Sequence, residues 1–327
     1  MRHSTNRFGP KLPILILLML VSVLSYIGYN YISPTIAKGL ISGTETKANT
    51  VNSKTLISNK DLSTQDESYV LIDPQTTQIL KSYNADLKRA PASTTKLLTG
   101  LVAEKTLQDT DVVSVGPEVN IEGSQLGLSP GDQISVKELL TALYVHSSND
   151  AAAALAVKIS GSIPAFAEEM NNYAATLGCT DSQFTNPHGM PDPDLYTTAN
   201  DLSKIASQFL KNERLMKLVK LPHARIQWKD AKGNPRQGEF DNTNLLLGNY
   251  PGDEGLKTGT TTEAGQCLVS YVTRPDGDLL LVLLGSENRY NDTIKLLDEG
   301  WADQRSKAAL RGLANDPKSL IMSPGIF

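Results

Sequence analysis

The pattern of apolar and polar residues sets the start of the chain apart from the rest. Residues 12–32 contain no Asp, Glu, Lys or Arg, and Arg2, Arg7 and Lys11 precede them. About 20 apolar residues behind a basic flank are typical of a membrane-spanning anchor whose basic end, here residues 1–11, stays in the cytoplasm. A cleaved secretory signal peptide has a similar pattern and is the alternative. With either interpretation, we expect the remainder of the chain on the extracytoplasmic side of the cell membrane.

A polar stretch follows the apolar one. Residues 33–67 are rich in Ser, Thr, Asn and Lys and contain no aromatic residue. This composition predicts a flexible extracytoplasmic linker, because such a segment has too little apolar surface to bury.

Beyond the linker, the hydrophobic pattern predicts a folded domain over residues 68–303 and a C-terminal tail over residues 304–327. Alternating or continuous apolar runs bounded by turn residues indicate strands, and the first two form a hairpin. The strands are expected at residues 69–73, 78–83, 265–273 and 279–285. The pattern over residues 293–301 predicts a helix that packs on this sheet at the end of the domain. Strands at both ends with helices between them favour an α/β fold, an antiparallel sheet flanked by helices.

Local signals place several helices between these strands. Pro91 is expected at a helix start that continues through residues 96–105. Ser135 and Glu138 form a capping-box pattern at the start of a second helix. We expect Asp150 to cap an alanine-rich third helix over residues 151–159. Residues 146–149 are therefore predicted to form a bend between two helices.

Three short motifs lie on these elements, namely Ser93-Thr94-Thr95-Lys96, Ser147-Ser148-Asn149 and Lys257-Thr258-Gly259. Each is too short to be informative alone. In this order they form the triple of serine acyl-transfer enzymes, and so we expect their side chains to share one site.

The residue types explain how such a site could work. A serine hydroxyl needs a neighbouring base, and Lys96 lies one helical turn from Ser93. Burial and a second cation, Lys257, are expected to lower the pKa of Lys96 until it is neutral. Ser147 could then relay a proton to the leaving amine, and Asn149 could hydrogen-bond a substrate amide.

The backbone completes the predicted chemistry. The Ser93 N–H, at a helix start, is expected to stabilise an oxyanion together with the Thr260 N–H. Gly259 would keep the strand edge open to the substrate backbone. Lys257, Thr258, Gly259 and Thr260 are thus predicted to bind substrate.

The chain resembles the low-molecular-mass penicillin-binding proteins, specifically the serine D-alanyl-D-alanine carboxypeptidases. The resemblance rests on residues 90–96, 147–151, 184–189, 196–201 and 255–261. It implies a DD-peptidase/β-lactamase-like fold with a mostly helical subdomain. It also implies that Arg289 helps to hold the substrate's terminal carboxylate. His188 is placed near the cleft by resemblance, without an assigned role.

The resemblance implies a reaction and partners. Ser93 would attack the peptide bond between the two D-alanines that end a peptidoglycan stem peptide, and water would hydrolyse the acyl-enzyme. β-Lactams would acylate Ser93 as covalent inhibitors. A D-alanyl endopeptidase of the same family is the main alternative. A non-catalytic penicillin or peptidoglycan sensor is another. A class A β-lactamase is less favoured, because no Glu-x-x-Leu-Asn segment lies between Asn149 and Lys257.

Composition excludes other classes. The net charge of −4 is not that of a nucleic-acid-binding protein, which is usually basic. The four His and two Cys are too dispersed for a zinc cluster, so no metal and no cofactor are expected. Cys179 and Cys267 are expected to be buried free thiols rather than a disulfide.

Overall fold

The computed structural model describes residues 67–315. The predicted cytoplasmic flank, membrane segment and most of the linker lie outside the described residues, as does the end of the tail. Within the described range, no helix combines the length and hydropathy needed to cross a bilayer.

The predicted antiparallel sheet is present and has five strands in the order β2-β1-β9-β8-β7. The strands are β1 (Ser68–Asp73), β2 (Gln78–Tyr83), β7 (Asp253–Thr261), β8 (Gly265–Arg274) and β9 (Gly277–Ser286). Each neighbouring pair is antiparallel, with Val70 opposite Val282 and Val282 opposite Val269. The strands at both ends of the chain therefore meet as predicted.

Alternation along the strands supplies both faces of this sheet with apolar side chains. Val70 and Val282 belong to a core cluster with residues of the helical region, such as Leu202. Leu71 and Leu281 face the other way and pack with Trp301. The sheet is thus buried on both sides, which explains why β9 reads as a continuous apolar run.

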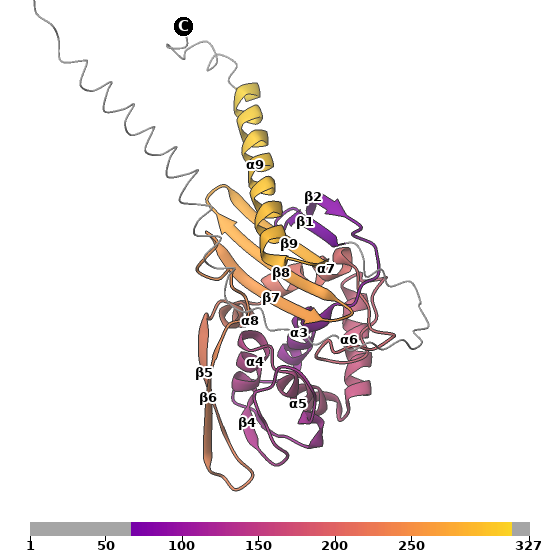
Figure 1. Cartoon of the computed structure of the whole chain (residues 1–327), viewed down its shortest axis with the longest axis vertical. Helices are drawn as coiled ribbons and strands as arrows, with labels where there is room; N and C mark the ends of the chain where they lie inside the picture. Colours follow the sequence, from indigo (N-terminus) through magenta and orange to yellow (C-terminus); the bar gives the residue numbers. More distant parts are fainter. Residues whose placement is uncertain (1–66, 316–327) are drawn as a thin grey trace, which may run out of the picture. The chain divides into compact units, whose positions relative to one another are not determined.

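The helices cover these two faces. They are the 3₁₀ turn η2 (Ala92–Thr95) and helices α3 (Lys96–Thr106), α4 (Val136–Val145), α5 (Asn149–Ser160), α6 (Ile163–Thr176), α7 (Ala199–Leu210), α8 (Glu213–Val219) and α9 (Arg289–Asn315). Helix α9 lies on one face, whereas α7 packs against β1 and β9 on the opposite face (Figure 1). This is the predicted sheet flanked by helices with a mostly helical subdomain.

A second sheet was not predicted. It contains β3 (Val112–Ser114), β4 (Gln133–Ser135), β5 (His223–Lys229) and β6 (Pro235–Asp241), in that order. A further 3₁₀ turn, Pro117–Val119, follows β3. Strands β3 and β4 have only three residues each and β6 is largely exposed, so neither length nor hydrophobicity marks these three in the sequence. Strand β5 does alternate between buried and exposed residues, a pattern that the sequence prediction missed.

Two local predictions need correction. The α-helix begins at Lys96, because Ala92 adopts φ 48° and the next residues form a 3₁₀ turn; Ser93 therefore precedes the α-helix. Ser148, not Asp150, is the N-cap of α5. The Asp150 carboxylate instead accepts hydrogen bonds from the N–H groups of residues 126–128. Helix α9 contains the predicted closing helix over residues 293–301 and extends beyond it.

The capping prediction at Ser135 is confirmed, since its hydroxyl accepts from the Glu138 N–H at 3.3 Å. The Glu138 carboxylate, however, accepts from the Gln227 N–H in β5.

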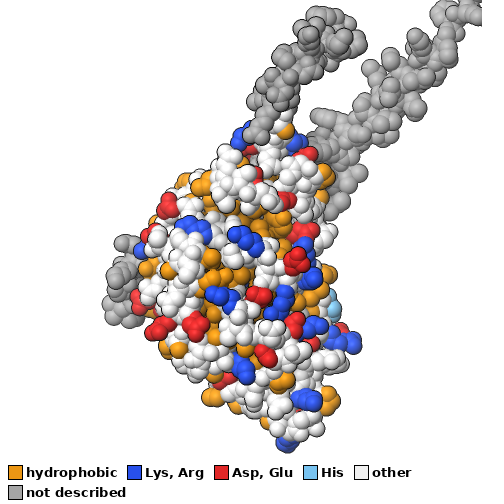
Figure 2. Space-filling model, turned by 180° about the vertical axis from the view of Figure 1, so that it is seen from behind, with side chains coloured by type: hydrophobic (Ala, Val, Ile, Leu, Met, Phe, Trp, Pro, Cys, Tyr) orange, Lys and Arg blue, Asp and Glu red, His pale blue; other side chains and the backbone are white. Residues whose placement is uncertain are grey.

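On the face drawn in Figure 2, Lys and Arg side chains are interspersed with Asp and Glu. This face of the described residues is unlike the basic surface of a nucleic-acid-binding protein.

Candidate active site

The first motif is held by the 3₁₀ turn. Side chains at positions i and i+3 eclipse one another in a 3₁₀ helix, and Ser93 and Lys96 have this spacing. The Lys96 Nζ consequently lies 2.8 Å from the Ser93 Oγ. The spacing of three residues and the 3₁₀ geometry together bring the candidate nucleophile and the candidate base into contact.

Lys96 is completely buried and has three oxygen partners. Besides Ser93, its Nζ lies 2.7 Å from Asn149 Oδ1 and 2.8 Å from the His188 carbonyl oxygen. The Asn149 Nδ2 donates to the Glu122 carbonyl at 2.6 Å, which fixes its oxygen toward Lys96. Two of the three partners of Lys96 can thus only accept hydrogen bonds.

This geometry suits a neutral amine. An uncharged lysine has two N–H donors and one lone pair, which matches two obligate acceptors and one hydroxyl. The lone pair then faces the Ser93 hydroxyl, whose proton it can accept. Burial, reinforced by the nearby Lys257 cation and opposed by Asp150, holds the pKa of Lys96 well below 10.5.

The second and third motifs meet in the same way. Ser147, at the bend between α4 and α5, adopts φ 63°, and its Oγ lies 2.8 Å from the Lys257 Nζ. Lys257 is fully buried and also donates to the Thr258 carbonyl at 2.9 Å. Burial, with a smaller contribution from Arg289, lowers the pKa of Lys257 to about 7.

Gly259 lies where β7 approaches Ser93, the candidate nucleophile. β7 is an edge strand of the sheet, and it packs against η2. A Cβ atom at Gly259 would lie 2.7 Å from the Ser93 backbone nitrogen and 3.0 Å from the Ala92 Cβ. Only glycine lets the strand edge, including Thr260, come this close to the Ser93 N–H.

Arg289 is the first residue of α9 and reaches across the ends of β7 and β8. Its Nη1 donates to the Gly259 carbonyl at 2.8 Å and to the Cys267 carbonyl at 3.1 Å, and its Nη2 contacts the Thr260 hydroxyl. These contacts bring a guanidinium group beside the third motif, 30 residues or more from it in sequence.

The loop at His188 is the part of the site that sequence reasoning missed. The backbone carbonyl of His188, rather than its imidazole, contacts Lys96. Asn186 Oδ1 accepts from the N–H groups of His188 and Gly189, which shapes the turn. A Cβ at Gly189 would lie 1.8 Å from the Ala92 carbonyl oxygen. The Asn-Pro-His-Gly string was a visible turn signal, but it does not reveal a backbone role.

The His188 imidazole is itself unsuited to act as a base near neutral pH. Its side chain is buried, and burial together with the Lys96 charge lowers its pKa to about 3. Its Nδ1 accepts a hydrogen bond from the Met190 N–H at 3.2 Å. The ring therefore stays neutral and supports the turn that presents the carbonyl to Lys96.

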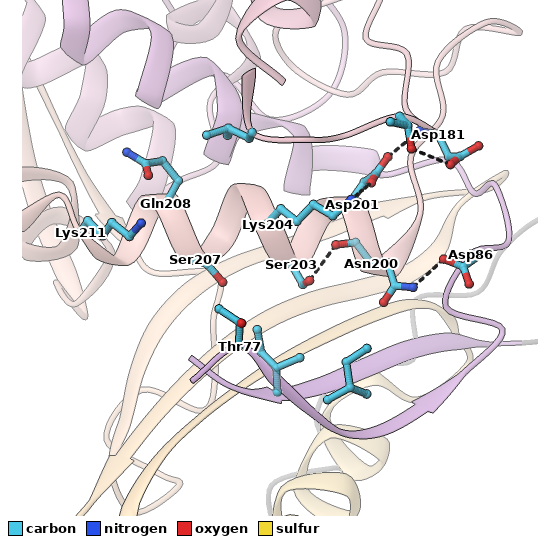
Figure 3. A pocket seen from close by; sticks show the side chains of 14 residues that line it. Thr77, Asp86, Asp181, Asn200, Asp201, Ser203, Lys204, Ser207, Gln208 and Lys211 are labelled. Atoms are coloured by element: carbon cyan, nitrogen blue, oxygen red, sulfur yellow. Dashed lines mark hydrogen bonds and ion pairs between the residues drawn. The ribbon is translucent and has the colours of Figure 1, made fainter. Parts of the chain in front are cut away.

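One further candidate feature lies away from these motifs. A pocket of about 630 Å³ opens between α7 and the β1–β2 hairpin, where Lys204 reaches Asp201 and Asn200 reaches Asp86 (Figure 3). None of the motif residues lines it.

Cys179 and Cys267 are buried free thiols, as expected. Among residues 67–315, no three His, Cys, Asp or Glu side chains are grouped to hold a metal ion.

The fold and the serine–lysine arrangement are those of active-site-serine DD-peptidases. The D-alanyl-D-alanine carboxypeptidase family matches residues 54–288, and the chain belongs to this family. D-alanyl-D-alanine carboxypeptidase DacF of Bacillus subtilis is 32% identical over 73% of this chain and 62% of its own length. DacC of Escherichia coli is 34% identical over 72% of this chain and 60% of its own length. The chain thus spans less than two thirds of these two relatives.

Relatives from Streptomyces K15 match over more of their length. The D-alanyl-D-alanine carboxypeptidase of this strain is 34% identical, over 67% of this chain and 81% of that protein. The crystal structure of the Streptomyces K15 DD-transpeptidase superposes with a TM-score of 0.69 at 31% identity, covering 72% of this chain and 96% of that one. The predicted DD-peptidase-like fold is confirmed.

Proposed function

We propose that this chain is a serine D-Ala-D-Ala carboxypeptidase that removes the terminal D-alanine from peptidoglycan stem pentapeptides. The observation that carries the proposal is the environment of Lys96, a buried amine with two obligate acceptors and the Ser93 hydroxyl at 2.8 Å. A neutral lysine so placed can accept the Ser93 proton as attack begins.

The remaining residues supply the rest of an acyl-transfer cycle. Ser93 Oγ bonds to the carbonyl carbon of the penultimate D-alanine, and the Ser93 and Thr260 N–H groups stabilise the oxyanion. The proton held by Lys96 passes through Ser147 to the leaving nitrogen, so the C–N bond breaks and free D-alanine departs. Water then hydrolyses the ester on Ser93 and the serine regains its proton.

The substrate-binding residues fit a peptide that ends in a carboxylate. Asn149 is placed to hydrogen-bond the stem-peptide amide, and β7 at Thr258 and Gly259 offers a strand edge for pairing. Lys257 and Arg289 provide positive charge, with Arg289 holding the terminal carboxylate. β-Lactams, which present a similar carbonyl and carboxylate, would acylate Ser93. A class A β-lactamase would turn them over instead.

We further propose that residues 12–32 anchor the chain in the cell membrane and that residues 33–67 let the catalytic domain reach peptidoglycan outside it. The uncharged apolar run behind a basic flank supports this arrangement. Cleavage of this segment as a signal peptide would release the domain. Fractionation tests the proposal, since an intact N-terminus in the membrane fraction supports the anchor and a shortened chain outside the cell contradicts it.

Product analysis tests the activity. The purified full-length chain in detergent is incubated with a pentapeptide muropeptide and, separately, with a cross-linked dimer, and the products are identified by mass. Loss of one alanine from the pentapeptide supports the carboxypeptidase. Monomers released from the dimer alone would favour the endopeptidase. The Ser93→Ala variant is the control. Binding of muropeptides without any product, by wild type and variant alike, would favour a sensor.

A further inference from the structure

Thr243 lies in the loop after β6, and its three polar groups bond to three different parts of the site. Its N–H donates to the Val145 carbonyl at 3.1 Å, at the end of the helix that leads to Ser147. Its hydroxyl lies 2.7 Å from the Thr258 hydroxyl in the third motif. Its carbonyl accepts from the Tyr290 hydroxyl at 2.8 Å. One residue therefore joins the neighbours of the second motif, the third motif and Arg289.

The residues on either side hold Thr243 in place. Both Asn242 and Asn244 are buried. The Asn242 Nδ2 donates to the Val219 and Leu221 carbonyls at 3.2 and 2.9 Å. The Asn244 Nδ2 donates to Asp253 Oδ2, at the start of β7, at 3.1 Å. Because these flanking amides are satisfied, Thr243 is a fixed junction and not a mobile loop residue.

Tyr290 connects this junction to the candidate carboxylate-binding residue. It follows Arg289 in the first turn of α9, and its ring lies 5.7 Å from the Arg289 guanidinium. Its hydroxyl also accepts from the Leu245 N–H at 3.3 Å. The Tyr290 hydroxyl thus ties the start of α9 to the loop 243–245, while Arg289 itself reaches Gly259 and Thr260.

We propose that Thr243 and Tyr290 are positioning residues that fix Arg289 relative to Ser147 and Thr258, and that they thereby make cleavage depend on a free carboxylate at the substrate's end. This inference rests on the proposed carboxypeptidase function. Small displacements of a substrate-positioning group are costly, because the reacting atoms must stay aligned. Removing these hydrogen bonds should therefore weaken recognition of the substrate's terminal carboxylate by Arg289 more than it slows the reaction at Ser93.

The test compares two substrates that differ only at the terminus, diacetyl-L-lysyl-D-alanyl-D-alanine and its C-terminal amide. Tyr290→Phe keeps the ring and removes the hydroxyl, and Thr243→Val removes the hydroxyl that meets Thr258. We expect kcat/KM for the carboxylate substrate to fall about tenfold, mainly through a higher KM, as expected for the loss of about one hydrogen bond. The amide should change by less than about twofold, so the preference for the carboxylate shrinks.

Three further variants serve as controls. Thr243→Ser keeps a hydroxyl and should restore most of the preference that Thr243→Val loses. Tyr83→Phe removes an exposed hydroxyl on β2, and Thr141→Val removes a hydroxyl that bonds within its own helix. Neither Tyr83→Phe nor Thr141→Val should alter the ratio of the two kcat/KM values. Thermal unfolding of each variant verifies that it is folded.

The outcomes separate this inference from the proposed function. An equal loss on both substrates would indicate a merely structural junction and overturn the inference, while the carboxypeptidase proposal would stand. An unchanged ratio in folded Tyr290→Phe and Thr243→Val also overturns it. A wild type that releases no D-alanine from the carboxylate substrate would overturn the proposed function and the inference with it.

Discussion

The side-chain oxygen of Asn149 lies 2.7 Å from the Nζ of Lys96. A carboxylate at this position would stabilise the charged form of Lys96, whereas the amide of Asn149 carries no charge. Because Asn149 is anchored by the Glu122 carbonyl and Lys96 is fully buried, the amine gains a hydrogen-bond acceptor without gaining a counter-charge. The contact keeps Lys96, the proposed base, oriented while its pKa stays low.

Asn149→Asp should reverse this effect. A carboxylate beside Lys96 favours the ammonium form and raises its pKa, so the neutral base appears only at higher pH. We expect the acid limb of the pH–rate profile for acylation to move up by about one unit and the rate at pH 7 to fall about tenfold. Stopped-flow acylation with a fluorescent penicillin between pH 5 and 10 measures both.

Asn149→Ala is the matched control, since it removes the same hydrogen bond without adding charge. It should slow acylation without moving the acid limb upward. An Asp variant with the limb of the wild type would show that Lys96 does not titrate in that limb.

Lys96→Arg tests whether the base must lose its proton. A guanidinium remains charged at all accessible pH values, so it cannot accept the Ser93 proton even though it can fill the same space. We expect acylation and D-alanine release to fall by about 10³-fold, the usual size of a general-base contribution. Lys105→Arg, in the same helix with its side chain over the Tyr173 ring, is the control and should be unchanged. Activity of Lys96→Arg within tenfold of wild type would contradict the assignment.

Gly259→Ala tests the approach of β7 to the nucleophile. The added Cβ would lie 2.7 Å from the Ser93 nitrogen, so either the strand or the 3₁₀ turn must shift. We expect at least a 100-fold loss of acylation, the order of effect of losing one oxyanion donor, and a lower unfolding temperature because backbone atoms must move. Acylation rates and thermal unfolding are measured together.

Gly248→Ala is the control for an effect through stability alone. Gly248 has φ +74°, and a Cβ there would meet no atom within 4 Å. Backbone strain should lower stability by about 1 kcal/mol while acylation stays at the wild-type rate. Loss of acylation in both variants would mean that glycine substitution acts through stability and not through contact with Ser93.

The parts of this molecule that the sequence predicts are those set by neighbouring residues. The spacing of Ser93 and Lys96, the bend at Ser147 and the Ser135 cap each depend on a few consecutive positions. Strand β9 was predictable for a different reason, since both faces of the sheet are buried and residues 279–284 are continuously apolar. Strand β8 was recognisable by its mainly apolar centre, which Ser270 interrupts.

The rest depends on contacts between distant segments. The His188 carbonyl reaches Lys96 across 92 positions, and a carbonyl leaves no trace in residue identity. Asp150 has the sequence position of a helix cap, yet its carboxylate accepts hydrogen bonds from the N–H groups of residues 126–128. The four-stranded sheet joins β4 to β5 through a single residue pair, Gln133 and Lys229, which no local pattern marks.

The last prediction concerns Asp253, at the start of β7, whose burial raises its pKa from 3.8 to about 6. Its carboxylate accepts from the Ser270 hydroxyl at 2.8 Å and from Asn244 at 3.1 Å. A raised folded pKa means that the native state binds the proton more tightly than the unfolded chain. Below about pH 4 the carboxyl group is largely protonated in both states, so Asp253 costs little stability there. The cost grows as the pH rises from about 4 to about 6, and above that it stays constant.

Asp253→Asn removes this titration and keeps the hydrogen bonds, because the Ser270 hydroxyl can accept from the new amide nitrogen while the oxygen still accepts from Asn244. Relative to the variant, the wild type should lose on the order of 2 kcal/mol of unfolding free energy between pH 4 and pH 7. Urea unfolding of both proteins at the two pH values measures the difference. An equal gap at both pH values would show that Asp253 titrates in the folded protein as it does in the unfolded chain, and that Ser270 and Asn244 compensate fully for its burial.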